Sequence, residues 1–71
     1  MTAQEWIREF AKEVDADPPG EDQMEAILKL AAVAAHASER TAAPMACWLA
    51  GVIGRDLDEL IVEAERIGEP A

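Results

Sequence analysis

The residues best suited to chemistry in this chain lie at one polar joint, 38–41, between two apolar runs. His36, Glu39 and Arg40 have the i, i+3, i+4 spacing that places side chains on one face of a helix. Thr41 follows directly and is predicted to cap the next helix, whose first N–H groups favour anions. Arg40 and this helix start could bind a carboxylate or phosphate, with His36 as a second donor. His36, Arg40 and Thr41 are therefore the candidate binding residues.

The same side chains also have a structural interpretation. His36 and Arg40 would lie near a helix C-terminus, where basic groups bond the last carbonyls and complement the helix dipole. Glu39, or a carboxylate from another helix, could pair with Arg40 inside the domain. We predict this structural role for Arg40 and expect Arg40→Lys to lower the melting temperature, because Lys cannot reproduce the planar geometry of the guanidinium.

Catalytic chemistry has few candidates elsewhere. Cys47 is the only cysteine and lies near the start of the predicted third helix, where a thiol pKa can be lowered. It has no adjacent base, so packing of a small residue is the better interpretation. One Cys and one His exclude the usual zinc patterns, and the acidic residues between 15 and 25 lack the order of a calcium loop. We therefore predict a domain that is not an enzyme and holds no metal or cofactor.

Composition limits the partners. The 71 residues include 15 acidic and 6 basic side chains, which give a net charge of −9. Such a chain repels phosphate backbones and anionic membranes, so neither a nucleic acid nor a membrane is predicted as a partner. The N-terminus has no signal-peptide pattern, and the longest nearly uncharged run is too short to span a bilayer. With a single cysteine, these features predict a cytoplasmic protein.

Hydrophobic periodicity predicts an all-α fold without strands. Thr2 and Asp56 have the positions of helix caps, Pro18-Pro19-Gly20 separates the first two helices, and Gly54 ends the third. We predict one domain over residues 1–71, a compact four-helix bundle with short connections and its second helix in the centre. Its helices are expected at about 3–14, 21–39, 42–53 and 57–67.

The apolar stripes also predict burial. Trp6 is expected to anchor the core, because few aromatic residues are present to pack with it. Leu28 and Ala31 lie on the stripe of the central helix and are expected inside. Gly51 weakens the third helix, which suggests close contact with a neighbouring backbone. A chain of this size buries only about 60% of the surface that its unfolded form exposes, so we also predict a homodimer.

The stretch from Leu28 to Gly51 resembles a small bacterial helical domain of unknown function. In that family the central helix ends in His-x-x-x-Arg, and a Pro-Ala-Ala-Pro turn leads into an apolar helix with Leu-x-Gly. Glu5-Trp6 in the first helix also fits, and Thr41 stands in place of the family's first proline. The matching residues here are His36, Arg40, Ala42-Ala43-Pro44 and Leu49-Ala50-Gly51.

That family occurs alone or fused to proteins similar to the molybdenum-cofactor guanylyltransferase. The resemblance implies an accessory role in the biosynthesis of molybdopterin-guanine dinucleotide, with such a guanylyltransferase as the candidate protein partner. It does not imply the transferase activity, which needs a nucleotide-binding α/β domain. The predicted function is a non-catalytic accessory or protein-interaction domain. The alternative is a small-anion or nucleotide-binding domain that uses the joint with His36, Arg40 and Thr41.

Overall fold

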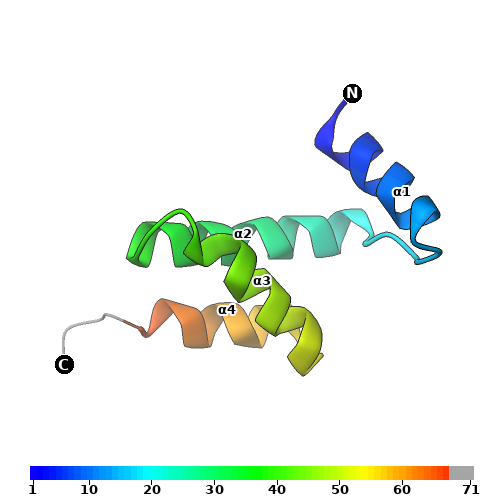
Figure 1. The fold of residues 1–71 in the computed structure, drawn as a ribbon. Coiled ribbons are helices and arrows are strands. Elements are labelled where there is room, and N and C mark those ends of the chain that lie inside the picture. Colours follow the sequence, from blue (N-terminus) through cyan, green and yellow to red (C-terminus); the bar gives the residue numbers. More distant parts are fainter. Residues whose placement is uncertain (68–71) are drawn as a thin grey trace.

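The computed structural model describes residues 1–67, which form four α-helices joined by short connections (Figure 1). No strand occurs in this part of the chain, so the predicted all-α fold of four helices is confirmed. The second and fourth helices end two residues earlier than predicted. None of the helices in this range is long and apolar enough to cross a membrane. The helices are α1 (Ala3–Glu13), α2 (Glu21–Ala37), α3 (Ala42–Ile53) and α4 (Leu57–Glu65).

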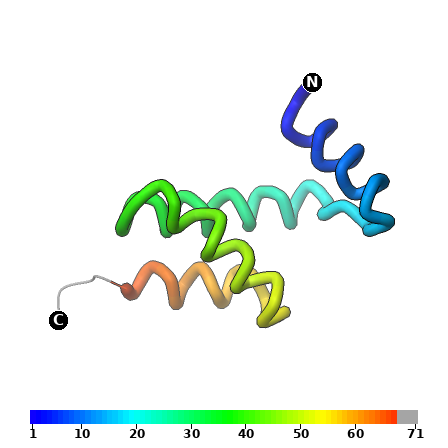
Figure 2. The backbone as a smooth tube through the Cα atoms, in the orientation of Figure 1, coloured from blue at the N-terminus to red at the C-terminus, as the bar shows by residue number. Residues whose placement is uncertain are grey.

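Helix α2 organises the packing, because both α3 and α4 lie against it. Figure 2 shows α4 running in the same direction as α2, with α3 crossing between them. The core contains Leu30 from α2, Ala50 from α3, and Leu60 and Ile61 from α4. Burying a Leu or Ile side chain stabilises a fold by about 1.5–3 kcal/mol. The core therefore depends on a few side chains around one central helix.

Helix α1 stands at an angle to the first turn of α2 and makes few contacts with the other helices (Figure 1). Its start has the predicted capping box. The Glu5 N–H donates to Thr2 Oγ1 at 3.1 Å, and the Thr2 N–H donates to Glu5 Oε1 at 3.2 Å. Local hydrogen bonds thus define the start of α1, which has little tertiary support.

Helix α1 ends in a left-handed turn before it reaches the prolines. Asp15 has φ +57°, and its N–H donates to the Lys12 carbonyl at 3.2 Å. The Ala16 N–H donates to the Ala11 carbonyl at 2.8 Å. These two bonds form a Schellman motif, which satisfies carbonyls at the helix end. The turn directs the chain away from the axis of α1.

Two burial predictions were wrong. Trp6, predicted as a core anchor, is 53% exposed and stacks on Phe10 with the ring centroids 5.2 Å apart. Leu28, predicted inside, is 66% exposed, whereas Ala31 is half-buried. The reason is that α1 does not fold back along α2. The side of α2 that a packed first helix would cover therefore stays open.

The glycine and cap predictions around α3 had mixed outcomes. Gly54 ends α3 with φ +70°, as predicted for a left-handed helix end. The close contact predicted for Gly51 is wrong, because nothing lies within 4 Å of the position that a Cβ would take there. Asp56 occupies the N-cap position of α4, but its side chain accepts no capping hydrogen bond.

Candidate functional site

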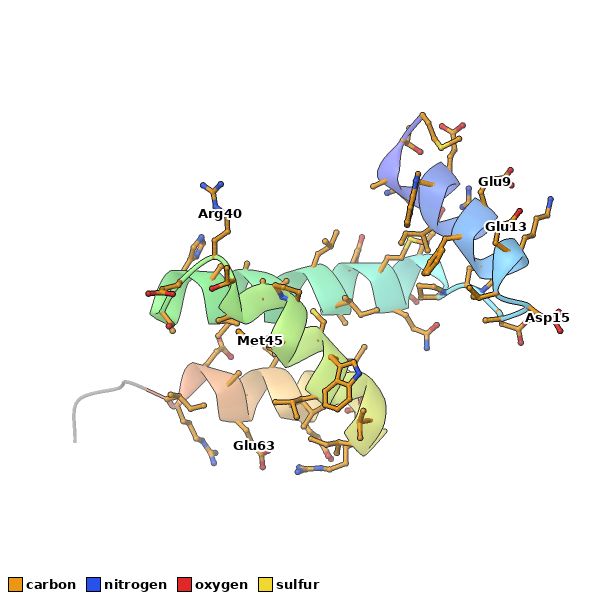
Figure 3. The ribbon with its side chains drawn as sticks, in the orientation of Figure 1. Glu9, Glu13, Asp15, Arg40, Met45 and Glu63 are labelled. Carbon is orange, nitrogen blue, oxygen red and sulfur yellow. The ribbon has the colours of Figure 1, made fainter. Side chains whose placement is uncertain are left out.

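The joint between α2 and α3 places His36, Arg40 and Thr41 on the surface. Figure 3 shows Arg40 pointing away from α3 and α4. Within residues 1–67 its guanidinium forms no hydrogen bond or ion pair, so this part of the chain does not provide the internal contact predicted for Arg40. Thr41 takes the N-cap position of α3, but its side chain accepts no capping hydrogen bond. No hydrogen bond in the described range joins the three candidate residues.

The start of α3 has few free donors for an anion. The Ala42 N–H donates to the Glu39 carbonyl at 2.9 Å, and the Ala43 N–H donates to the Arg40 carbonyl at 3.2 Å. The next residue, Pro44, has no N–H. The groups that usually bind anions at a helix start are therefore occupied or absent. Anion binding at the joint stays a prediction, and it would depend on the side chains of His36 and Arg40.

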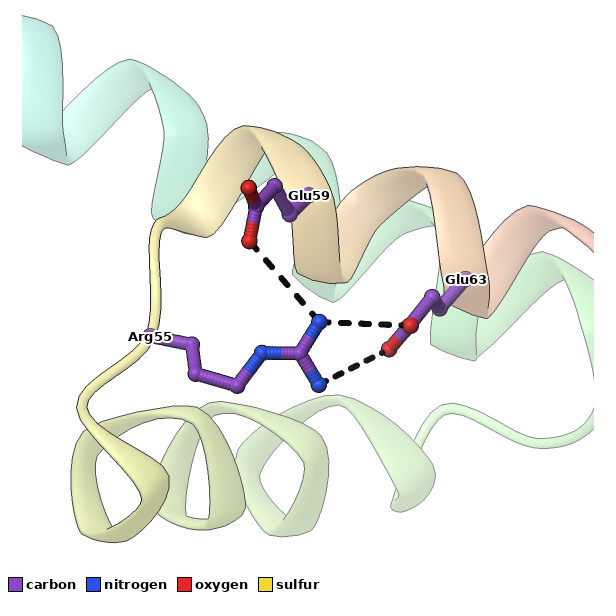
Figure 4. A network of polar contacts seen from close by, with 3 residues as sticks. All are labelled: Arg55, Glu59 and Glu63. Carbon is purple, nitrogen blue, oxygen red and sulfur yellow. Dashed lines mark hydrogen bonds and ion pairs between the residues drawn. The ribbon is translucent and has the colours of Figure 1, made fainter.

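A polar network that was not predicted lies at the turn between α3 and α4 (Figure 4). Arg55 Nη1 donates to Glu63 Oε2 at 3.3 Å, and Nη2 donates to Glu63 Oε1 at 3.2 Å. Nη2 also lies 3.8 Å from Glu59 Oε2. The hydrogen bonds and charge of Glu63 raise the pKa of Arg55, with a smaller contribution from Glu59. All three side chains are exposed, so the network adds little to stability.

The sequence signal for this network was the four-residue spacing of Arg55, Glu59 and Glu63. Arg55 precedes α4, and its long side chain lies along the first turns of that helix (Figure 4). The guanidinium is therefore already paired with carboxylates of its own chain. This leaves Arg55 poorly placed to bind an external anion.

Cys47 faces α2, where its Sγ lies 3.8 Å from the Ile27 carbonyl oxygen. Partial burial raises the pKa of this thiol, so the neutral form is favoured. Cys47 lines a groove of about 350 Å³ together with Gln23, Ile27, Gly51 and Arg55. This groove contains no base for a nucleophile. Among the described residues, no cluster of three or more metal-ligating side chains occurs.

The surface that stands out is the outer face of α3. No residue of α3 carries a charged side chain. Trp48 is 68% exposed and Val52 is 63% exposed, and their large apolar neighbours on the helix are also exposed. Figure 3 labels Met45 on this helix. We define the outer face of α3 as Met45, Trp48, Leu49, Val52 and Ile53.

These side chains are exposed because α3 packs against the core through the opposite side of the helix, which carries small side chains. Ala46 and Ala50 pack against the core cluster that contains Leu30 of α2. Cys47 also faces α2. Small side chains let two helices approach closely, so α3 turns its small side inward and its large side chains outward. The helical periodicity of the sequence groups these large side chains on one face, but it does not show that this face lies outside.

The apolar side of α1 is similarly uncovered. Trp6, Phe10 and Val14 recur at helical spacing, and each is about half exposed. Their charged neighbours Glu9 and Glu13, with Asp15 after the helix, point away from the molecule in Figure 3. Amphipathic helices usually bury such a stripe. The described part of the chain therefore has two uncovered apolar faces, on α1 and on α3.

Residues 1–69 match a family described as a domain of unknown function, DUF6457. No curated protein and no solved structure matches the chain.

Proposed function

We propose that this chain, which belongs to the DUF6457 family of domains of unknown function, is a non-catalytic domain that binds protein through the outer face of α3. The observation that carries this proposal is the exposure of five large apolar side chains on a helix without charge. Contiguous apolar patches on small proteins commonly mark interaction sites. When a partner removes such apolar surface from water, the hydrophobic effect contributes about 25 cal/mol of favourable free energy per Å² buried.

The chemistry of the remaining groups supports a non-catalytic role. The raised pKa of Cys47 favours the thiol over the nucleophilic thiolate. Arg55 is paired with Glu63. His36 and Arg40 lie on an exposed surface next to a helix start whose N–H groups are occupied. Guanylyl transfer from GTP by the purified chain, lost on a single substitution, would contradict this part of the proposal.

We further propose that the partner belongs to the biosynthesis of molybdopterin-guanine dinucleotide, with a molybdenum-cofactor guanylyltransferase as the candidate. The support is the resemblance of His36, Arg40 and Leu49-Ala50-Gly51 to domains that occur fused to such proteins. A domain that is fused to an enzyme is held beside it permanently. Either arrangement is served by a binding surface for the enzyme, and the outer face of α3 is suited to this.

Co-purification from the native host tests the proposal. The tagged chain is compared with Val52→Glu on the outer face of α3 and with Val62→Glu on α4, because both valines are exposed. We expect the wild type and Val62→Glu to retain a guanylyltransferase-like protein and Val52→Glu to lose it. Equal retention of the same proteins by all three would contradict the assigned surface. Retention of an unrelated protein that depends on Val52 would contradict only the link to the molybdenum cofactor.

A further inference from the structure

We propose that, in the isolated protein, a second copy of this chain covers the outer face of α3. The two α3 helices would pack across a two-fold axis and run antiparallel. This inference rests on the proposed function, because it names an occupant of the same surface. It also implies that self-association competes with the binding of any other protein there.

The chain exposes more surface than a compact chain of its size. The accessible surface of the chain is 5760 Å². A folded monomer of 7.7 kDa is expected to expose roughly 4,300 Å². The radius of gyration, 13.2 Å, likewise exceeds the value of about 11 Å expected for a compact chain of this length. The excess surface, which the uncovered faces of α1 and α3 share, is larger than the roughly 800 Å² per partner that a standard stable interface buries.

The charge distribution selects α3 as the contact between two copies. Each copy carries a net charge of −9, so two copies repel one another wherever acidic surfaces meet. α1, α2 and α4 each present acidic side chains, whereas α3 presents none. Homodimer interfaces are also more apolar than other interfaces. Two copies can therefore approach closely along α3 with the least repulsion.

Symmetry fits the same arrangement. A two-fold axis makes the same residues meet from both sides, and an axis perpendicular to α3 sets the two helix dipoles in opposite directions. Gly51 is not part of this contact, because it lines the groove between α3 and α2 together with Cys47 and Ile27.

Sedimentation of the full chain from nanomolar to high micromolar concentration tests the proposal. Three exposed valines give matched variants: Val14→Glu at the C-cap of α1, Val52→Glu on α3 and Val62→Glu on α4. We expect a wild-type dimer at micromolar concentration and at least a 100-fold higher dissociation constant for Val52→Glu, because symmetry introduces the charge twice. Val14→Glu and Val62→Glu should stay within a few-fold of the wild type.

Two controls separate loss of the interface from a change in net charge and from unfolding. Val52→Lys, which lowers the net negative charge, should also dissociate the dimer, since the effect comes from a charge in the interface. Circular dichroism should show that the Val52 variants keep the wild-type helix content. A wild type that is monomeric throughout would overturn the proposal, and so would dissociation by Val14→Glu or Val62→Glu in place of Val52→Glu. A monomeric wild type that still loses its co-purified partner on Val52→Glu would leave the proposed function standing.

Discussion

Helices α3 and α4 both pack against α2, but they use opposite kinds of side chain to do so. α4 turns Leu60 and Ile61 into the core and keeps its acidic residues outside. α3 turns Ala50 inward and keeps Trp48 and Val52 outside. Helix α4 is thus an ordinary amphipathic surface helix, with its apolar side buried in the same chain and its polar side in solvent. Helix α3 is apolar on its inner and outer sides, as is typical of a helix that is buried on both sides.

This difference suggests separate roles for the two helices. The contacts of α4 stabilise the single chain, because its apolar stripe is buried and its carboxylates pair with Arg55. The large side chains of α3 add little to the single chain, because water still reaches them. Their contribution would appear only when another protein covers them.

The largest expected effect comes from truncating the buried side of α4. Ile61 is 3% exposed, so Ile61→Ala should lower the free energy of unfolding by about 2–5 kcal/mol. Val52→Ala on α3 should change it by less than about 0.5 kcal/mol in the monomer. Urea unfolding at a concentration where the protein is monomeric gives both values. An equal loss of unfolding free energy in the two variants would contradict the claim that only α4 buries its large side chains within the single chain.

A smaller effect is expected at the two glycines of α3. Gly51→Ala should stabilise the monomer by about 0.5–1 kcal/mol, because the position is helical and has free space. Gly54→Ala should destabilise it by about 1–2 kcal/mol, because φ is +70° there. Thermal unfolding of the monomer measures both changes. A destabilised Gly51→Ala monomer would show that Gly51 has a contact within its own chain.

Sequence patterns predicted the helices of this domain better than their packing. The capping box at Thr2 and the helix end at Gly54 follow from local hydrogen bonding and local backbone geometry, and both were confirmed. The burial of Trp6 and Leu28 depended on whether α1 folds back along α2. That depends on the turn that begins at Asp15, whose left-handed conformation is uncommon for any residue other than glycine, although Asp adopts it more often than most.

The candidate site was predicted only in part, for a similar reason. The spacing of His36 and Arg40 predicted one face of a helix end, but α2 ends at Ala37 and Arg40 lies in the turn beyond it. The spacing also does not show whether another helix supplies a partner. The Arg55 network was visible as a spacing but was not distinguished from other surface charges. The side of α3 that packs inward depended on the small side chains Ala46 and Ala50 and on their fit against α2.

A third prediction concerns pH and is confined to α1. The Thr2 N–H and hydroxyl bond Glu5 and lower the pKa of its carboxyl group. Ionised Glu5 therefore stabilises the start of α1 fully above its unfolded pKa, and this contribution is lost as pH falls through the lower folded pKa. Amide exchange should show α1 opening in acid while the amides of α4 stay protected. Glu5→Gln should abolish this pH dependence, and opening of α1 and α4 together would contradict the weak coupling of α1.

The smallest effect is expected at the joint. Arg40→Ala should change the free energy of unfolding by less than about 0.5 kcal/mol, because the side chain is exposed and has no partner within the described residues. Arg40→Lys should behave in the same way. Thermal melts of both variants beside the wild type provide the measurement. A fall of several degrees in either variant would restore the structural role for Arg40.

The central claim is that protein covers the outer face of α3 in solution, and the fluorescence of Trp48 tests it most directly. The Trp6→Phe variant leaves Trp48 as the only tryptophan. Its emission should shift to longer wavelength on dilution, over the same concentration range in which sedimentation shows dissociation. Trp6→Phe combined with Val52→Glu should emit at the longer wavelength at every concentration. A Trp48 emission that stays at the solvent-exposed wavelength throughout, and with the co-purified partner added, would contradict the claim.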